Sequence, residues 1–470
     1  MSSLRRAACA LALLSSFCGQ PARAQSASVA ETAARDKHAP SATTHGAATA
    51  TTALSLYFDP QQGTSASDLV RRALSSNGEL AAARLEIERA RARLRQAGLR
   101  PNPALDFEQT TGRLTGSAGE SETSVGLSLP LEVGGQRRRR VDLARAELEA
   151  AEAEVADRGR RLAAEVLGLH AEALATLREL EITEGLTDLD LKTVAVVQTR
   201  VEEGESAPIE LNLLRVEVER LRSRRALSEG RLQATLLRLK ALAGVPPSEP
   251  LRLREGLSNA ALRGPQGSVE AAIEAALRTR PAVRLARLNE EVAEAGLRLA
   301  RAQGSPEVTA SARYTHSNSS FDDTPVGPLR DKDRLLTFGV TVGLPVFNKN
   351  QGAKAEAAIA ITQARSRREF LEAVVRSEVA SAYARYEAAS KALLAYEQGV
   401  IQRSQENVRV MRAAYELGAF SVTELLAEQR RLLDSQRDYT EALAEQYRAL
   451  ADLQTAVGAS LTNDAAPEKE

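Results

Sequence analysis

The chain has 470 residues, and its 62 basic side chains balance 62 acidic ones, so the formal net charge is zero. A nucleic-acid-binding protein normally shows a basic excess, so this balance argues against that class. Hydrophobic residues make up 43% of the chain and aromatic residues 3%, with no Trp. Abundant Ala, Leu, Glu and Arg with little Gly or Pro predict unusually long helices with little globular core.

The first 24 residues have the order of a secretory signal peptide. Two arginines precede an apolar stretch over 7–17, and small residues around Ala24 offer a cleavage site. Both cysteines, Cys9 and Cys18, lie inside this segment. Cleavage after Ala24 would leave a mature chain with no thiol for a disulfide or a metal. The alternative is lipidation at Cys18, although Phe17 is large for the position before a lipidated cysteine.

Residues 25–64 and 461–470 are predicted to be a flexible N-terminal arm and a flexible tail. The arm is rich in Ala, Thr and Ser and shows no apolar period. Between them we find no uninterrupted apolar run of the length that a membrane helix needs. An exported chain of this kind is expected to cross a membrane with strands.

The chain contains an internal repeat. Three pairs of identical residues recur at the same spacing of 214 positions: Gly204 and Gly418, Gly244 and Gly458, Glu210 and Glu424. A constant spacing of this kind indicates duplicated structural units. We expect a first repeat over 65–245 and a second over 268–460, joined by a linker over 246–267.

Each repeat is expected to have the same order of elements. The first is a helix, over Ser67–Gly98 and Ser268–Gln303, and a pair of short strands follows it. Next comes a long helical stretch, over Gln136–Glu203 and Asn350–Leu417, which at 1.5 Å per residue would span roughly 100 Å. A glycine turn then leads into a returning helix. Apolar residues at three- and four-residue steps predict coiled-coil packing of these helices.

Alternating sequences predict four strands. Apolar and small polar residues alternate around four segments: 105–108, 124–129, 308–314 and 337–344. This period indicates strands with two different surroundings. Four strands are too few to close a membrane barrel, since the smallest have eight. Oligomers would solve this, with the apolar face toward lipid and the polar face toward a water-filled lumen.

Two connecting segments, Gly112–Glu122 and Ser317–Asp333, are predicted to be surface loops. The second holds four acidic residues: Asp322, Asp323, Asp331 and Asp333. Their alternative interpretation is a weak cation site.

In their order and duplication, several segments resemble the TolC-like outer membrane efflux proteins. The segments are Ala97–Pro103, Gly126–Leu131 with Gly134-Gly135, the Gly204 turn, and Tyr415–Gly418 followed by Glu424-Leu425-Leu426 and Gln429-Arg430. The resemblance covers residues 65–460. Pro345–Gly352 is most similar to the CzcC-type branch, which serves cation efflux pumps.

The resemblance implies a fold that is mainly α with a small β part. Long coiled-coil helices would form a periplasmic α-barrel, and four strands per chain would join a trimeric twelve-stranded outer-membrane β-barrel. It further implies a homotrimer in outer-membrane lipid, with a periplasmic adaptor protein and an inner-membrane proton-coupled transporter as partners. The expected function is passive conduction of divalent metal cations to the exterior. The alternatives are a duct for drugs or other small molecules and a soluble periplasmic coiled-coil scaffold.

The resemblance also assigns roles to the two helix turns. The periplasmic adaptor would dock on ten residues: Glu203, Gly204, Glu205, Ser206, Ala207, Leu417, Gly418, Ala419, Phe420 and Ser421. Glu210 and Glu424, six positions after each turn glycine, would lie at a periplasmic constriction, where rings of carboxylates favour cations. The next acid of the family pattern falls on Ala427, with Glu428 beside it, so this sequence has no carboxylate at the position of a second ring. The alternatives are tight turns and solvated helix faces.

Nothing in the sequence indicates an enzyme, a cofactor or a metal centre. His170 and His316 have no Cys, His or Asp at ligand spacing, so His170 is expected to be a packing residue inside a helix and His316 to end a strand. Gly134-Gly135 is too short for a phosphate-binding loop. The basic run Arg137–Arg140 is expected to be solvated or to face lipid headgroups.

Overall fold

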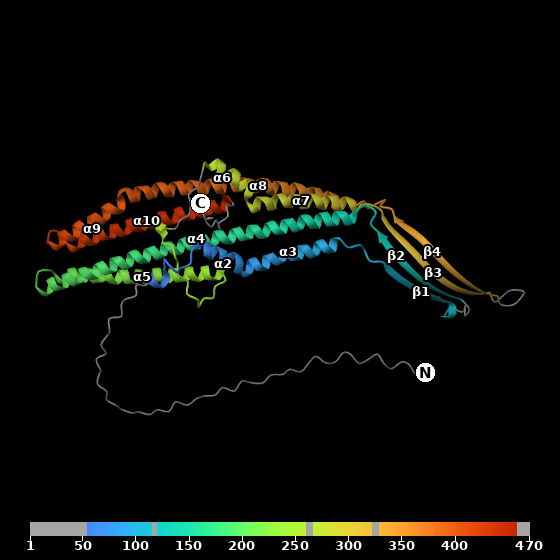
Figure 1. The fold of residues 1–470 in the computed structure, drawn as a ribbon, viewed down its shortest axis with the longest axis horizontal. Coiled ribbons are helices and arrows are strands. Elements are labelled where there is room, and N and C mark those ends of the chain that lie inside the picture. Colours follow the sequence, from blue (N-terminus) through green and yellow to red (C-terminus); the bar gives the residue numbers. More distant parts are fainter. Residues whose placement is uncertain (1–53, 115–119, 260–266, 322–328, 458–470) are drawn as a thin grey trace, which may run out of the picture. The chain divides into compact units, whose positions relative to one another are not determined.

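The computed structural model describes residues 54–114, 120–259, 267–321 and 329–457 of the chain. The chain divides into two units, Met1–Ala50 and Thr51–Glu470, and every described residue lies in the second. This unit combines long helices with one four-stranded sheet (Figure 1). The predicted fold class, mainly α with a small β part, is confirmed. The predicted signal peptide and C-terminal tail lie outside the described residues.

The two repeats have matching elements. The first consists of α2 (Ala66–Ser76), α3 (Gly78–Ala97), β1 (Ala104–Thr111), β2 (Ser121–Leu131), α4 (Gln136–Glu202) and α5 (Pro208–Leu242). The second consists of α6 (Val269–Thr279), α7 (Pro281–Ala302), β3 (Glu307–Phe321), β4 (Leu329–Gly343), α8 (Gln351–Ala395), α9 (Ile401–Glu416) and α10 (Val422–Val457). Short elements complete the description: α1 (Leu54–Tyr57) and the 3-10 turns Gly112–Leu114 and Leu257–Asn259. No helix within the described ranges is both long and apolar enough to cross a membrane.

The first helix of each repeat is broken in two, so the prediction of continuous helices over Ser67–Gly98 and Ser268–Gln303 is wrong. Asn77 has extended backbone angles and its Oδ1 accepts a hydrogen bond from the N–H of Leu80 at 2.9 Å, which starts α3 afresh. In the second repeat Arg280 is extended and Pro281 opens α7. A proline cannot donate the backbone bond of a helix interior and disfavours helical angles in the residue before it.

The long helices were predicted well in the first repeat and less well in the second. α4 is one helix of 67 residues, and it lies beside α5 in a hairpin (Figure 1). The corresponding stretch Asn350–Leu417 is interrupted by a π-helical turn over Tyr396–Val400, which separates α8 from α9. The turn glycines Gly204 and Gly418 have φ values of 80° and 77°, the left-handed region that favours glycine.

The sheet runs in chain order, β1-β2-β3-β4, with every neighbouring pair antiparallel. β3 and β4 each have 15 residues, so they extend into the predicted loop Ser317–Asp333. Asp331 and Asp333 lie in β4, whereas Asp322 and Asp323 are outside the described residues. The predicted loop Gly112–Glu122 is likewise shortened, since β2 already begins at Ser121. His316 lies within β3, not at its end.

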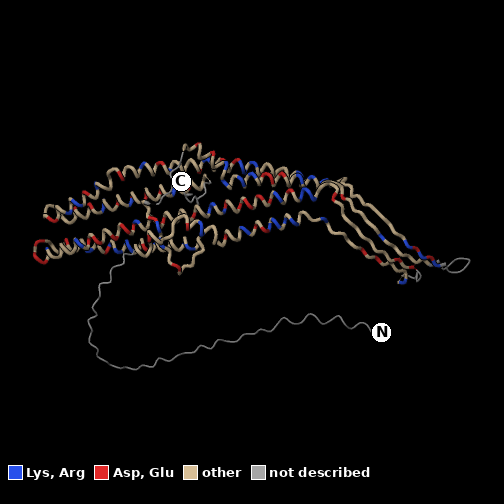
Figure 2. The backbone as a smooth tube through the Cα atoms, in the orientation of Figure 1, with Lys and Arg blue, Asp and Glu red and all other residues tan. Residues whose placement is uncertain are grey.

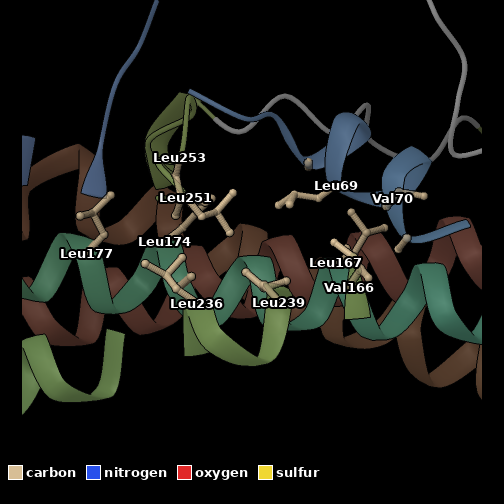
Figure 3. Close-up of a cluster of buried hydrophobic side chains, with 14 of the residues drawn as sticks. Leu69, Val70, Val166, Leu167, Leu174, Leu177, Leu236, Leu239, Leu251 and Leu253 are labelled. Atoms are coloured by element: carbon tan, nitrogen blue, oxygen red, sulfur yellow. The ribbon is translucent and has the colours of Figure 1, made fainter. Parts of the chain in front are cut away.

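The largest hydrophobic core lies where α2, α4 and α5 meet the segment that joins the two repeats (Figure 3). Its members include Leu69, Val166, Leu174, Leu239 and Leu253. Part of the predicted linker 246–267 packs into this core, since Leu251, Leu253 and Leu257 are buried in it. The prediction of a flexible arm up to residue 64 is also wrong at its end. There α1 forms, and Phe58 and Thr64 each make a β-bridge with Leu253.

Candidate functional site

The ten predicted docking residues form the turns at the ends of two helical hairpins, which we call the first tip (203–207) and the second tip (417–421). All are exposed except Ser206, which is half-buried. Backbone bonds close both turns: the N–H of Glu205 donates to the carbonyl of Arg200, and that of Ala419 to the carbonyl of Ala414. This pattern ends a helix at a left-handed glycine. The tips are thus defined turns whose side chains are mostly exposed.

Polar bonds join residues beside the first tip to residues beside the second. The hydroxyl group of Tyr415 donates to Oε2 of Glu210 at 3.2 Å, and Arg200 donates to the carbonyl oxygen of Glu416 at 2.5 Å. A small hydrophobic cluster lies behind them, made of Val197, Leu211, Leu214, Tyr415, Val422, Leu425 and Leu426. Burial raises the pKa of Tyr415 to about 12, and the negative charge of Glu210 adds to the rise. The two repeats are therefore held together at this end.

The two predicted constriction acids have different surroundings. Glu210 is half-buried and accepts the Tyr415 bond. Glu424 is exposed and caps its own helix: its carboxylate accepts from the N–H of Ser421 at 2.8 Å, while Ser421 Oγ accepts from the N–H of Glu424 at 3.4 Å. The backbone bond from Ser421 lowers the pKa of Glu424. The Ser-x-x-Glu spacing is that of a capping box and was visible in the sequence.

A buried polar pair lies further along the same helices. Gln429 of α10 donates from Nε2 to Oδ1 of Asp190 on α4 at 3.0 Å, and Asp190 is 2% exposed. Burial raises the pKa of Asp190 to about 6, and the charge of Glu217 contributes in the same direction. Gln429 Oε1 is buried with no partner within the described ranges. Sequence reasoning missed this pair, because a single polar residue within a helical period carries no signal of its own.

The sheet separates charges by face. Residues in register share a face, and the contacts of Arg313 with Asp106 (2.9 Å), Glu108 (3.2 Å) and Ser124 (3.0 Å) identify one of them. By this register the acidic face, as we call it, holds Arg313 and six carboxylates: Asp106, Glu108, Glu122, Glu307, Asp331 and Asp333. The opposite face, the apolar face, holds no acid within the described strands, and large side chains such as Phe107 and Phe338 are exposed on it.

The basic run Arg137–Arg140 is solvated only in part: Arg137 and Arg138 are exposed, as predicted, but two of its side chains also bond to the end of α3. Arg137 Nε donates to the carbonyl oxygen of Gly98 at 2.6 Å, and Arg140 donates to that of Leu99 at 3.2 Å while pairing with Glu132. Carbonyl groups at the end of a helix lack intrahelical partners and attract cationic side chains. Arg137 and Arg140 therefore anchor the end of α3 where the helices meet the sheet.

The described residues contain no group of three or more His, Cys, Asp or Glu arranged to hold a metal ion. The two described acids of the predicted weak cation site, Asp331 and Asp333, belong to β4 instead. His170 is fully buried with its Nδ1 3.2 Å from the Tyr447 hydroxyl group, and burial lowers its pKa to about 4. It is therefore a packing residue inside the protein, as predicted.

Comparison with known proteins places this arrangement in a family. The chain is similar to the cobalt-zinc-cadmium resistance protein CzcC of Cupriavidus metallidurans, at 24% identity over 82% of this chain and 88% of the relative. It is also similar to the nickel-cobalt-cadmium resistance protein NccC of Alcaligenes xylosoxydans xylosoxydans, at 26% identity over 57% of each. A crystal structure of CusC matches the fold with a TM-score of 0.71 and 22% identity, covering 86% of this chain and 96% of that one.

The family profile described as outer membrane efflux protein matches residues 69–245 and 272–459, which span both repeats. It confirms the resemblance to TolC-like proteins, and the first relative agrees with the CzcC-type segment at Pro345–Gly352. The chain belongs to the outer membrane efflux protein family.

Proposed function

We propose that this outer-membrane efflux channel is the exit duct for divalent metal cations, which it conducts passively. The observation that carries the proposal is the acidic face of the sheet, where six carboxylates stand against one guanidinium group. A surface with this excess of negative charge attracts cations and raises their local concentration. The names of CzcC and NccC, both metal resistance proteins, support the same cargo.

The sheet edges support assembly as a homotrimer. β1 and β4 are the two edge strands of the sheet. Each is paired with a neighbouring strand on one side only, so its other side is open for pairing with another copy. Pairing β4 of one copy with β1 of the next would continue the antiparallel order, and three copies would close twelve strands without a free edge. The acidic face would then line the lumen and the apolar face would contact lipid.

The two tips fit the role of a docking and constriction region at the periplasmic end. Leu417 and Phe420 are 86% and 43% exposed, and an exposed apolar side chain at a turn suits contact with another protein. Glu210 and Glu424 would be repeated by the three-fold axis at the constriction. The docking partner would be a periplasmic adaptor, and an inner-membrane proton-coupled transporter would supply the energy. Passive conduction requires no catalytic residue and no cofactor.

Selectivity in planar bilayers tests the lumen assignment. With a salt gradient, the reversal potential of the wild-type channel should show cation preference. Glu122→Gln together with Asp333→Asn should reduce that preference, whereas Lys332→Gln, on the opposite face of the same strand, should leave it unchanged. An anion-preferring wild type, or a selectivity that ignores the two acids, would contradict the lumenal position of the acidic face.

The constriction has its own test. Glu210→Gln together with Glu424→Gln should lower cation selectivity at the periplasmic end of the channel. Unchanged selectivity in this double variant would contradict the constriction role of Glu210 and Glu424, but it would not contradict the function as a duct.

Cargo and location are tested in cells. A strain without the protein should accumulate cobalt, zinc or cadmium and lose resistance to them. Normal metal levels with retained drugs would instead favour the drug duct. Recovery of the protein from the soluble periplasm without detergent would favour the scaffold.

A further inference from the structure

The outer end of β4 alternates basic and acidic residues in the order Arg330, Asp331, Lys332, Asp333, Arg334. Successive residues of a strand point to opposite faces, so the three basic side chains share one face and the two acids share the other. All five residues are exposed. We call Arg330, Lys332 and Arg334 the basic row. Figure 2 shows both charge signs gathered at the end of the sheet farthest from the helices.

The basic row continues the apolar face. Leu336, the next residue of β4 on that face, pairs with Tyr314, and the rows below it hold Phe338, Val340 and Val342. On β3 the apolar part runs from Val308 to Tyr314, which at about 3.4 Å per residue covers roughly 20 Å. The apolar band of membrane strand proteins is about 25 Å tall. Arg334 is thus at the upper border of an apolar band, with Lys332 and Arg330 about 7 and 14 Å beyond it.

Within the described strands, the basic row has no acidic residue on its own face. Arg334 is opposite His316 and Lys332 is opposite Asn318, neither of which is an acid. None of the three basic side chains forms an ion pair within the part of the chain that the structure describes. The acids of the same strand, Asp331 and Asp333, lie on the opposite face of the sheet. Neighbouring cations with no acidic partner among the described residues are available to bind an external anion.

We propose that the basic row binds the phosphate groups of an anionic lipid in the outer leaflet of the membrane. The inference rests on the proposed function in one respect, namely that the apolar face contacts lipid. The helices join the other end of the sheet, so periplasmic helices place the basic row at the outer surface. Arginine binds phosphate oxygens through two N–H groups at once, and lysine adds a point charge. The apolar band directly below would contact the acyl chains of the same lipid, which a free phosphate ion does not have.

Native mass spectrometry of the full-length protein in a neutral detergent, titrated with bisphosphorylated lipid A, tests this proposal. The variant Arg330→Gln/Lys332→Gln/Arg334→Gln should bind on the order of 100-fold more weakly, since each basic residue at an anionic lipid surface contributes about fivefold. The matched control Asp331→Asn/Asp333→Asn changes the same strand on its other face and should bind as the wild type does. Lys332→Gln alone should weaken binding by about fivefold and provides a milder change.

The remaining arms separate lipid from other anions. Lipid A with one phosphate should bind the wild type more weakly than the bisphosphorylated form, and inorganic phosphate in excess should not displace either. Equal lipid binding by the triple variant and the wild type would overturn the proposal, and so would displacement by inorganic phosphate. Bilayer conductance of the triple variant keeps the two proposals apart. Normal channels that have lost lipid binding support the basic row, whereas a wild type that never inserts contradicts the proposed function itself.

Discussion

The hydroxyl group of Tyr415 donates a hydrogen bond to Oε2 of Glu210 across 3.2 Å and 205 positions of sequence. Tyr415 is buried and Glu210 is half-buried, so this bond lies in a partly desolvated place where its loss would be felt. Together with the Arg200 bond to Glu416, it connects the helical hairpin of the first repeat to that of the second near their turns.

Tyr415→Phe should loosen the two tips without changing the fold. A hydrogen bond to a charged group contributes about 1.5–3 kcal/mol, so amide hydrogen exchange around both tips should become at least about tenfold faster. Tyr439→Phe is a matched control, because it removes a 3.2 Å bond to Glu397 elsewhere on α10 and should leave exchange at the tips unchanged. Unaltered exchange at both tips in Tyr415→Phe would show that the hydrophobic cluster alone holds them.

Ser421→Ala should destabilise the start of α10. The Ser421 side chain accepts from the N–H of Glu424, and loss of such a cap costs about 1 kcal/mol. The equivalent position in the first repeat is Ala207, which forms no side-chain cap for α5. Ala207→Ser should therefore slow hydrogen exchange in the first turn of α5, while Ser421→Ala speeds it in α10. The same direction of change in both variants would contradict a capping role.

Asp190→Asn should stabilise the protein near neutral pH. Burial raises the folded-state pKa to about 6 from its ordinary value of 3.8, so the folded protein holds the proton more tightly than the unfolded chain. Stability is then full at low pH and falls as pH rises from about 4 to about 6, by up to about 3 kcal/mol. The charged and polar groups that face Asp190 are Glu217 of α5, Arg412 of α9 and Gln429 of α10.

An asparagine at position 190 keeps the bond from Gln429 and can donate to Gln429 Oε1, which has no partner among the described residues. Thermal unfolding between pH 4 and 8 measures the effect, and the loss of stability between pH 4 and 6 should shrink in the variant. Asp188→Asn, an exposed change on the same helix, is the control and should keep the wild-type profile. A variant less stable than wild type at pH 7 would show that Asp190 is ionised and useful there.

His170→Gln should change the dependence of stability on pH on the acid side, in the opposite sense to Asp190→Asn. Burial lowers the folded-state pKa to about 4 from 6.5, so the folded protein favours the neutral ring. Its contribution is present above about pH 6.5 and is lost as pH falls toward 4, by up to about 3 kcal/mol. When the pH falls from 7.5 to 4.5, the variant should lose less stability than the wild type does. An unchanged acid limb of the thermal unfolding profile would contradict this.

Much of the fold could be predicted from the sequence because local rules decide it. The glycine turns at 204 and 418 and the length of α4 follow from conformational freedom and helical period. The breaks at Asn77 and Arg280 were missed because the apolar period continues on both sides of them, although Pro281 was a signal. The charged end of β4 is rich in polar residues that predict a loop, yet alternating charges suit a strand whose two faces meet different surroundings.

The site was predictable only in part. The tips and the acids Glu210 and Glu424 could be located from the repeat and the resemblance. Their partners could not, because Tyr415 reaches Glu210 through packing between distant segments and Asp190 meets Gln429 in the same way. No spacing rule within one segment reports such contacts.

The duplicated halves no longer use the same chemistry at matching positions. A side-chain cap at Asn77 corresponds to a proline after Arg280, and an uncapped Ala207 corresponds to the capping box at Ser421. One tip offers acids and small residues, and the other offers exposed Leu417 and Phe420. The two tips of one chain therefore offer a partner protein two unlike surfaces. Identical copies of such a partner must either all bind the same tip or contact the two tips in two different ways.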